Sequence, residues 1–162
     1  MNLTIRPITP AEIDTFLRWR YEPPSDIYNM LPSGGDGDVY DEIFEYFLMP
    51  AYRCSAILHE GELVGFCTFG ADGRVEGGDY SQPALDIGMG MKPDLTGKKN
   101  GDSFIAAIIQ YANKTFAPPR LRVTIAVTNL RAQRVWQKAG FVQEEQFTCP
   151  RNGKQFATFV HC

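Results

Sequence analysis

The sequence lacks any apolar run long enough to cross a membrane. Its longest strictly apolar stretch, residues 104–109, is far shorter than the roughly 20 residues that a transmembrane helix needs. The opening MNLTIRP also has no apolar core of the kind that a secretory signal carries. We therefore expect a cytoplasmic protein that makes no membrane contact.

Metal-binding residues are equally scarce. The chain has only 2 His, His59 and His161, and its 4 Cys include no CxxC pair. The cysteines lie in segments with a strand-like pattern, which favours buried thiols in a reducing compartment over disulfides. They are Cys54, Cys67, Cys149 and Cys162. The sequence thus predicts no metal site.

The chain does contain enough apolar material for one folded domain over residues 1–162. Of its 162 residues 44% are apolar and 22% charged, and a chain of this length buries about 70% of its unfolded surface. Residues 1–91 hold 5 basic and 15 acidic side chains, whereas residues 92–162 hold 11 and 4. Electrostatic fields of opposite sign on the two halves of one domain suit one anionic and one cationic ligand. A drift of surface charge along the chain, without any function, would give the same numbers of basic and acidic side chains. The acidic half disfavours nucleic acid as a partner.

Hydrophobic periodicity predicts the element order β-α-α-β-β-β-α-β-α-β-β. The expected strands cover 2–6, 52–58, 63–69, 84–92, 121–127, 141–147 and 155–161. The expected helices cover 10–21, 41–49, 102–115 and 130–139, with polar loops at 22–37 and 70–82. A strand, a helix and a strand follow one another over 84–127, so two strands should pair in parallel inside a mostly antiparallel sheet. The fold class is therefore α+β or mixed α/β.

The segment 84–115 is the most informative part of the chain. A turn over 96–101 leads into a helix, whose first N–H groups and dipole favour an anion, and Lys98 and Lys99 add positive charge. In the preceding strand, alternation places Asp86, Gly88 and Gly90 on one face. Such glycines leave a strand face without side chains, either for close approach of another group or for a bulge beneath a helix.

These residues resemble the acyl-CoA-binding core of the GNAT N-acetyltransferase superfamily, in particular its ribosomal-protein N-terminal acetyltransferase branch. The first motif runs from Leu85-Asp86-Ile87-Gly88 to Gly101. The second, from Asn129 to Gly140-Phe141, is similar to the Asn, Ala, aromatic and Gly-Phe segment of that superfamily. The two motifs occur in the element order of the family, so the resemblance covers essentially the whole chain.

The resemblance implies a V-shaped opening between the strands that end at Met91 and Val127. It implies that the pantetheine arm of acetyl-CoA pairs with the backbone of Met89 and Met91, and that Asn129 contacts this arm or the acyl group. It also assigns the diphosphate to the turn Thr96, Gly97, Lys98, Lys99, Asn100 and Gly101. Relatives often have Gly where Lys99 stands, so Lys99 departs from the pattern and would weaken the site if the position needs a positive φ. Residues 1–91 then form the acceptor side of the domain and residues 92–162 the coenzyme side.

Two residues are candidates for the chemistry. Asp86 stands where relatives commonly carry Glu, and either accepts a proton from the amine or only binds a cation or an arginine. Trp136 stands where relatives often have the Tyr that protonates the CoA thiolate, and an indole N–H cannot replace that acid. Tyr80 and Tyr111 are candidate substitutes for this acid, and water is the alternative to both.

The acceptor side is acidic and rich in tyrosine. Residues 21–52 contain seven carboxylates and no Lys or Arg. Tyr28, Tyr40 and Tyr46 lie among them and either form the wall of a pocket for a cation or pack as an ordinary amphipathic helix.

We therefore expect an acetyl-CoA-dependent N-acetyltransferase that acts on a primary amine of a small molecule or a peptide N-terminus. A module that binds acyl-CoA without turnover is the alternative, and an interaction domain without a nucleotide is the third class. Formation of a homodimer through the closing hairpin is left open.

Overall fold

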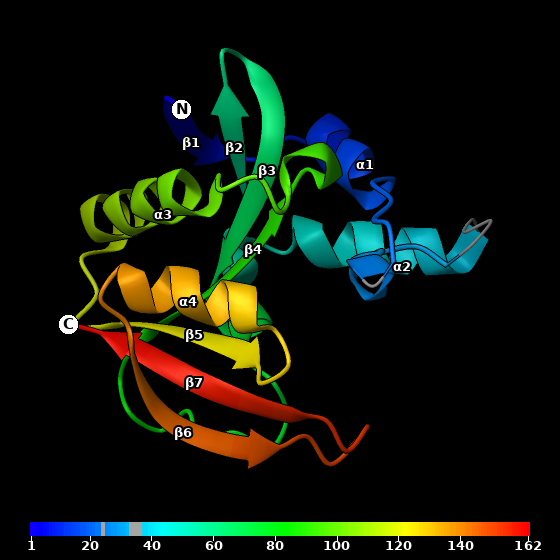
Figure 1. Ribbon diagram of the computed structural model, residues 1–162. Coiled ribbons are helices and arrows are strands. Elements are labelled where there is room, and N and C mark those ends of the chain that lie inside the picture. Colours follow the sequence, from blue (N-terminus) through cyan, green and yellow to red (C-terminus); the bar gives the residue numbers. More distant parts are fainter. Residues whose placement is uncertain (24, 33–36) are drawn as a thin grey trace.

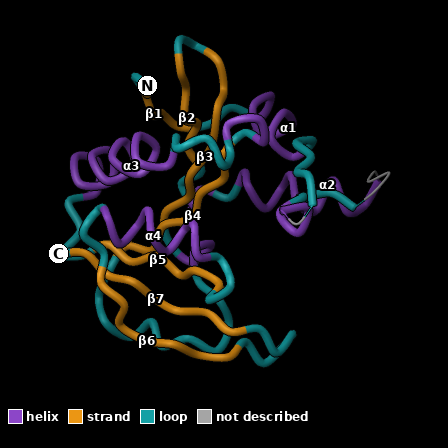
Figure 2. Tube along the Cα trace, viewed as in Figure 1, coloured by secondary structure: helices purple, strands orange, loops and turns teal. Residues whose placement is uncertain are grey.

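Seven strands form one mixed sheet in a computed structural model of residues 1–162, which describes every residue except 24 and 33–36. The strand order across the sheet is β1-β2-β3-β4-β5-β7-β6 (Figures 1 and 2). The strands are β1 (Leu3–Pro7), β2 (Ser55–His59), β3 (Glu62–Phe69), β4 (Leu85–Met91), β5 (Leu121–Ala126), β6 (Val142–Thr148) and β7 (Gln155–His161).

Helices cover both faces of this sheet. The α-helices are α1 (Pro10–Leu17), α2 (Gly37–Leu48), α3 (Gly101–Phe116) and α4 (Leu130–Lys138). Short 3-10 turns are η1 (Ser25–Tyr28), η2 (Pro50–Tyr52), η3 (Ala71–Gly73) and η4 (Pro93–Leu95). Figure 1 shows α3 and α4 on one side of the strands and α1 and α2 on the other. This arrangement confirms the predicted fold class and element order.

The first helix is shorter than its apolar pattern predicts. The capping box forms as expected, because the Thr9 side chain accepts from Glu12 N–H and the Glu12 side chain accepts from Thr9 N–H. At the other end, Trp19 N–H reaches back only to the Phe16 carbonyl, so the last turn tightens and α1 ends at Leu17. The predicted loop 22–37 contains η1, and its residues 24 and 33–36 lie outside the described part of the chain.

The sheet divides where its two parallel strands separate. β4 and β5 pair only over Leu85–Ile87 and Leu121–Val123. Beyond that point β4 continues along β3 as far as Met91, while β5 continues along β7 as far as Ala126. Each strand follows the twist of a different neighbour, so the two diverge as the resemblance implies.

Two buried clusters fill the two faces. The larger lies between the sheet and α3 and α4, and includes Ile87, Phe104 and Trp136. The smaller lies under α1 and α2, and includes Phe16, Phe47 and Phe66. Side chains alternate along β4, so Ile87 points to the first cluster and Asp86, Gly88 and Gly90 point to the α1 and α2 side. The acidic helix α2 lies on this second face.

Three of the four cysteines are buried and unpaired, as expected, but Cys162 is exposed because it follows the last residue of β7. None of the helices among the described residues combines the length and apolar character needed to span a bilayer. In the same part of the chain, no three His, Cys, Asp or Glu side chains converge as ligands for a metal ion.

Candidate active site

One edge of β4 is open beyond its paired stretch. Gly70 N–H donates to the Asp86 carbonyl at 2.9 Å, so the backbone groups of Asp86 point toward β3. In an antiparallel ladder alternate residues direct their backbone groups to the same neighbour. The N–H and C=O groups of Met89 and Met91 therefore point away from β3, into the gap that β5 leaves.

A tyrosine from the acceptor side already binds one of these groups. The Tyr21 hydroxyl donates to the Met91 carbonyl at 2.6 Å. Burial raises the pKa of Tyr21 to about 12, so the phenol remains a proton donor through the neutral range. Tyr21 thus ties the segment after α1 to the end of β4, across 70 residues of sequence.

The turn before α3 presents unpaired N–H groups. Gly97 has φ 72° and Lys99 has φ 62°, both in the left-handed region. Asn100 caps α3 without a side-chain hydrogen bond, because its amide instead donates to the Leu95 carbonyl at 2.9 Å. Within the described chain, no backbone N–H of residues 97–101 donates a hydrogen bond. A turn in which residues with positive and negative φ alternate, and whose backbone N–H groups are free, is suited to binding an anion.

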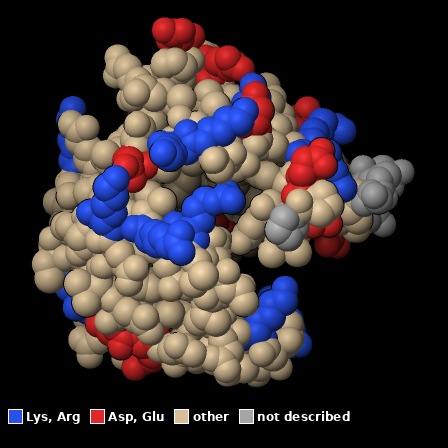
Figure 3. Space-filling view, in the orientation of Figure 1, with Lys and Arg blue, Asp and Glu red and all other residues tan. Residues whose placement is uncertain are grey.

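Cationic side chains surround this turn. Lys98 and Lys99 are exposed. A Cβ placed on Gly97 would lie 3.4 Å from Nη1 of Arg131, so the first turn of α4 brings a guanidinium to the same place. Figure 3 shows Lys and Arg side chains gathered around a hollow over α3 and α4. Diphosphate oxygens would meet both hydrogen-bond donors and positive charge here.

Asn129 lies at the far arm of the opening and has two partners. Its side-chain oxygen accepts from Ala132 N–H at 3.1 Å and so caps α4. Its amide donates to the Tyr28 hydroxyl oxygen at 2.9 Å. Tyr21 and Tyr28 therefore contact the two arms of the opening, at Met91 on one side and at Asn129 on the other.

Asp86 is held between two arginines. Arg122 donates through Nε at 2.6 Å and through Nη2 at 2.8 Å, and Arg74 donates through Nε at 2.8 Å. The hydrogen bond from Arg122 to Asp86 raises the pKa of that guanidinium. Asp86 is only 1% exposed and both its oxygens accept hydrogen bonds from arginine. Of the roles expected from the sequence, the ion pair with arginine is therefore the one present in the structure. The action of Asp86 as a base stays a prediction.

Tyr80 lies against the same arginines. The Arg122 guanidinium is 4.8 Å from the Tyr80 ring centre. The Tyr80 hydroxyl accepts from Val75 N–H at 2.9 Å and lies 2.9 Å from Thr124 Oγ1. Thr124 follows Val123, the last residue of β5 that pairs with β4, so the phenol lies where the strands begin to separate.

The glycines of β4 allow another group to approach the strand closely, which is one of the two alternatives that the sequence leaves open. A Cβ on Gly88 would lie 2.5 Å from Thr68 Oγ1, and one on Gly90 would overlap the Phe66 ring. Thr68 and Phe66 stand opposite these glycines on β3 and occupy the space. The glycines therefore make room for side chains of the protein itself.

Two other aromatic candidates belong to the core. Trp136 is buried and packs edge-on against Phe141, with ring centres 4.9 Å apart. Tyr111 packs against Phe69 and Phe116 on the inner side of α3. The two histidines lie away from the opening: His59, the last residue of β2, contacts the Asn2 carbonyl before β1, and His161 in β7 packs on Phe141.

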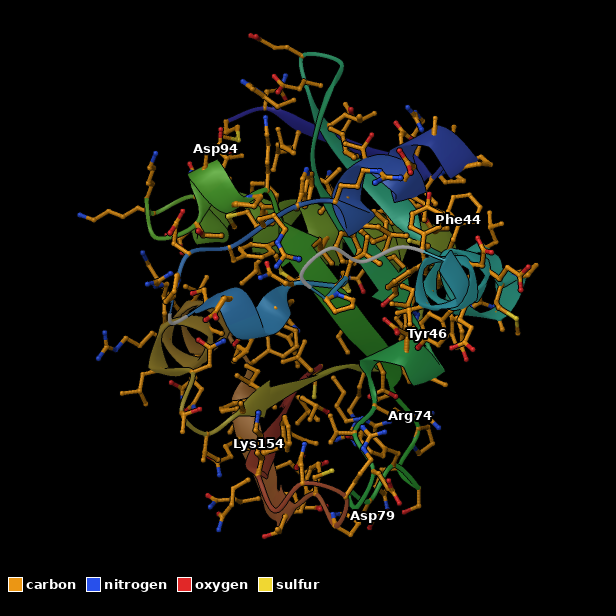
Figure 4. The ribbon with its side chains drawn as sticks, turned by 90° about the vertical axis from the view of Figure 1, so that its right-hand side faces the viewer. Phe44, Tyr46, Arg74, Asp79, Asp94 and Lys154 are labelled. Atoms are coloured by element: carbon orange, nitrogen blue, oxygen red, sulfur yellow. The ribbon has the colours of Figure 1, made fainter. Side chains whose placement is uncertain are left out.

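The tyrosines of α2 face the acceptor side. The Tyr46 hydroxyl donates to Asp72 in η3, and Tyr40 donates to Asp14 in α1. Figure 4 shows Tyr46 on α2 beside η3, with Arg74 further along the same loop. Burial, followed by this bond to Asp72, raises the pKa of Tyr46. Tyr40 thus joins α1 to α2, whereas Tyr46 joins α2 to the β3–β4 loop.

Sequence reasoning missed Tyr21, Arg122 and Arg131. A signal for Arg122 exists, because it is the only charged residue in the apolar strand LRVTIA and must find a buried partner. No local pattern indicates the other two, since their contacts join segments far apart in the chain.

Comparisons with known proteins agree with this geometry. A family model described as "Acetyltransferase (GNAT) domain" matches residues 2–142. No curated protein matches the chain. Spermidine N-acetyltransferase SpeG from Vibrio cholerae, solved with CoA and spermine, superposes with a TM-score of 0.73 at 15% identity, covering 98% of this chain and 94% of that chain. Aminoglycoside acetyltransferase AAC(6')-Ib, solved with ribostamycin and coenzyme A, gives a TM-score of 0.76 at 18% identity, covering 99% and 93%. At these identities the likeness shows a shared fold.

Proposed function

The chain belongs to the GNAT acetyltransferase domain family, and on that basis we propose that it transfers the acetyl group of acetyl-CoA to a primary amine by direct attack within a ternary complex. The observation that carries the proposal is the opening between β4 and β5. It combines the backbone groups of Met89 and Met91, which pair with no neighbouring strand, with cations and backbone N–H groups at 97–101 that donate to no described residue. Of the strand groups, the Met91 carbonyl accepts from Tyr21.

The residues present fit the coenzyme. Met89 and Met91 offer strand-like hydrogen bonds to the amides of a pantetheine arm. The turn from Thr96 through Gly97, Lys98, Lys99 and Asn100 to Gly101, with Arg131 beside it, offers N–H donors and charge to the diphosphate. Asn129 stands at the second arm, where its amide can turn from Tyr28 to a ligand. When bound, acetyl-CoA supplies the activated acetyl group as a thioester.

The chain's own residues then orient the acceptor and handle protons. No enzyme nucleophile is required for direct transfer to an amine. Tyr80, whose hydroxyl lies at the point of strand separation, donates a proton to the departing thiolate, and Thr124 orients it. Asp86 holds Arg122 and Arg74 against the Tyr80 ring and so positions the phenol. Because both Asp86 oxygens accept hydrogen bonds from arginine, Asp86 receives the amine proton through an intervening water.

The acceptor is a cationic amine. This part of the proposal is supported by the acidic α2 and by the spermine and aminoglycoside ligands of the structural neighbours. A peptide N-terminus, as in the ribosomal-protein branch, is the second acceptor class. A cytoplasmic location and a homodimer stay predictions.

Calorimetry with acetyl-CoA and CoA, followed by thiol release with an array of amines, tests the proposal. Arg131→Gln should weaken CoA binding about tenfold, because a charge-assisted contact to phosphate is lost. Arg134→Gln removes another, equally exposed arginine of the same helix and is the matched control. Absence of CoA binding by the unaltered protein would refute the enzyme assignment.

The alternative, an acyl-CoA-binding module, is favoured by one observation. Trp136, at the position of the usual acid, is buried in the core and presents no hydroxyl to the opening. Tight CoA binding without thiol release from any amine would support the module over the enzyme.

A further inference from the structure

A second carboxylate, Asp72, lies at the point where β4 and β5 separate. Asp72 belongs to η3, and this turn packs directly on β4, since a Cβ on Gly73 would lie 3.0 Å from the Ile87 carbonyl. A Cβ on Gly88 would lie 3.1 Å from Oδ2 of Asp72. Gly88 is the first residue of β4 beyond its pairing with β5. The Asp72 carboxylate therefore sits at the base of the opening, on the acceptor side of the sheet.

Neutral donors hold this carboxylate in place. Thr68 Oγ1 donates to Oδ2 at 2.5 Å, and the Tyr46 hydroxyl donates to Oδ1. Within the described chain no Lys, Arg or His nitrogen lies within 4.0 Å of it, whereas Asp86 has two arginines. Asp72 is half-buried, so its charge is oriented by the protein but is not balanced by a cation of the protein.

The surroundings favour a cationic ligand. The Tyr46 ring lies 4.5 Å from the Tyr52 ring, and Tyr46 is 37% exposed. Aromatic faces attract ammonium groups. Asp41, Glu42 and Glu45 are exposed on the same helix as Tyr46, which adds a negative field around the site.

The nitrogen that binds here differs from the one that is acetylated. Contact with a carboxylate favours the charged form of an amine, whereas attack on a thioester requires the neutral form. A carboxylate fixed by two hydrogen bonds therefore suits a nitrogen that remains an ammonium throughout the reaction.

We propose that Asp72, positioned by Tyr46 and Thr68, binds a non-reacting ammonium group of an acceptor that carries at least two amines. This assignment rests on the proposed acetyl transfer and narrows its acceptor to a diamine, a polyamine or an aminoglycoside. Asp72 is then a substrate-binding residue that selects for a second positive charge.

The test compares putrescine with aminobutanol, which has the same chain length but a hydroxyl in place of the second amine. The wild-type protein should show a kcat/KM for putrescine at least about tenfold higher, the value expected for a hydrogen bond between charged groups. Asp72→Asn should remove this preference while leaving CoA binding unchanged in calorimetry. Tyr46→Phe keeps the carboxylate but loses one of its hydrogen bonds, and should reduce the preference only in part.

Glu76→Gln is the matched control. It removes one negative charge from the same loop, and Glu76 is exposed and makes no hydrogen bond or ion pair to a described residue. This variant should retain the wild-type preference.

The outcomes separate the two proposals. Failure of the wild-type protein to bind CoA would refute the acetyl transfer. CoA binding together with an unchanged preference in Asp72→Asn, or an equal loss for both amines, would overturn only the role of Asp72. If Asp72→Asn does not fold, calorimetry of the two amines on the CoA-loaded wild-type protein decides. Equal affinities would overturn the assignment, and tighter putrescine binding that Tyr46→Phe weakens would support it.

Discussion

Asp86 and Arg122 occupy facing positions on the two strands that separate, and their side chains form a two-point ion pair inside the protein. Asp86 is 1% exposed and Arg122 is 0% exposed. The pair joins β4 to β5 one residue before their pairing ends, so it fixes the point from which the opening begins.

The Asp86→Asn variant should therefore be less stable, because it leaves the Arg122 charge buried without its partner. We expect its free energy of unfolding to be lower by about 3–5 kcal/mol. Urea denaturation measures the loss. Arg74→Gln, which removes the partly exposed partner, should cost far less. An Asp86→Asn protein that kept its stability and lost only turnover would instead favour Asp86 as a base.

Lys99→Gly should stabilise the protein by about 1 kcal/mol. Lys99 adopts φ 62°, a left-handed conformation that costs a residue with a Cβ about 1–2 kcal/mol and costs glycine little. Lys98→Gly removes the same charge at a position without positive φ and should give no such gain. Equal midpoints of thermal unfolding for both variants would contradict the expected relief of strain.

Tyr21→Phe should bind CoA about fivefold more tightly. The change frees the Met91 carbonyl from the 2.6 Å hydrogen bond and leaves it for a ligand, at a cost to stability of about 1 kcal/mol. Calorimetry with CoA measures the affinity. Tyr111→Phe is the control, since the Tyr111 hydroxyl donates to no other described residue. Weaker CoA binding by Tyr21→Phe would mean that Tyr21 supports the coenzyme instead of competing with it.

Glu12→Gln should reveal a dependence of stability on pH. The hydrogen bond from Arg6 lowers the pKa of Glu12, helped by the capping contacts of Thr9. Because the folded pKa lies below the unfolded one, the carboxylate stabilises the fold above about pH 4, and this contribution is lost as pH falls through the folded pKa. The variant should be less stable by up to about 1 kcal/mol at neutral pH and equal to the wild type in strong acid.

Urea denaturation across the acid range measures this difference. Glu60→Gln, in the exposed β2–β3 turn, is the control. A Glu12→Gln difference that persisted undiminished in strong acid would contradict the prediction.

Much of the fold was predictable because it follows from local patterns. The Thr9–Glu12 capping box, the apolar stripe of α3 and the final hairpin each depend on neighbours within a few residues. The end of α1 was not predictable in this way, because apolar residues continue past Leu17 and only the backbone shows where the helix tightens.

The candidate site also has one part that the sequence predicts and another that it does not. The turn 96–101 is recognisable from its glycines and lysines, and the left-handed backbone at Gly97 agrees with that composition, whereas Lys99 adopts the same conformation without being a glycine. The division into an acceptor half and a coenzyme half remains a proposal, and it does not separate the parts cleanly. Met89 and Met91, from the acceptor half, would bind the coenzyme, while Asn129 contacts Tyr28 of the acceptor segment.

The sequence by itself determined the order of strands and helices, the parallel crossover and the position of the turn at 96–101, because periodicity and turn chemistry act over short distances along the chain. Only the tertiary structure decided what Asp86, Tyr21 and Asp72 contact. Their partners are brought together by the sheet, and the choice among several buried or nearby charges depends on packing in three dimensions. A carboxylate at the right strand position therefore turned out to be balanced by arginines, while another, from a loop without a recognisable motif, was left without a cation of its own among the described residues.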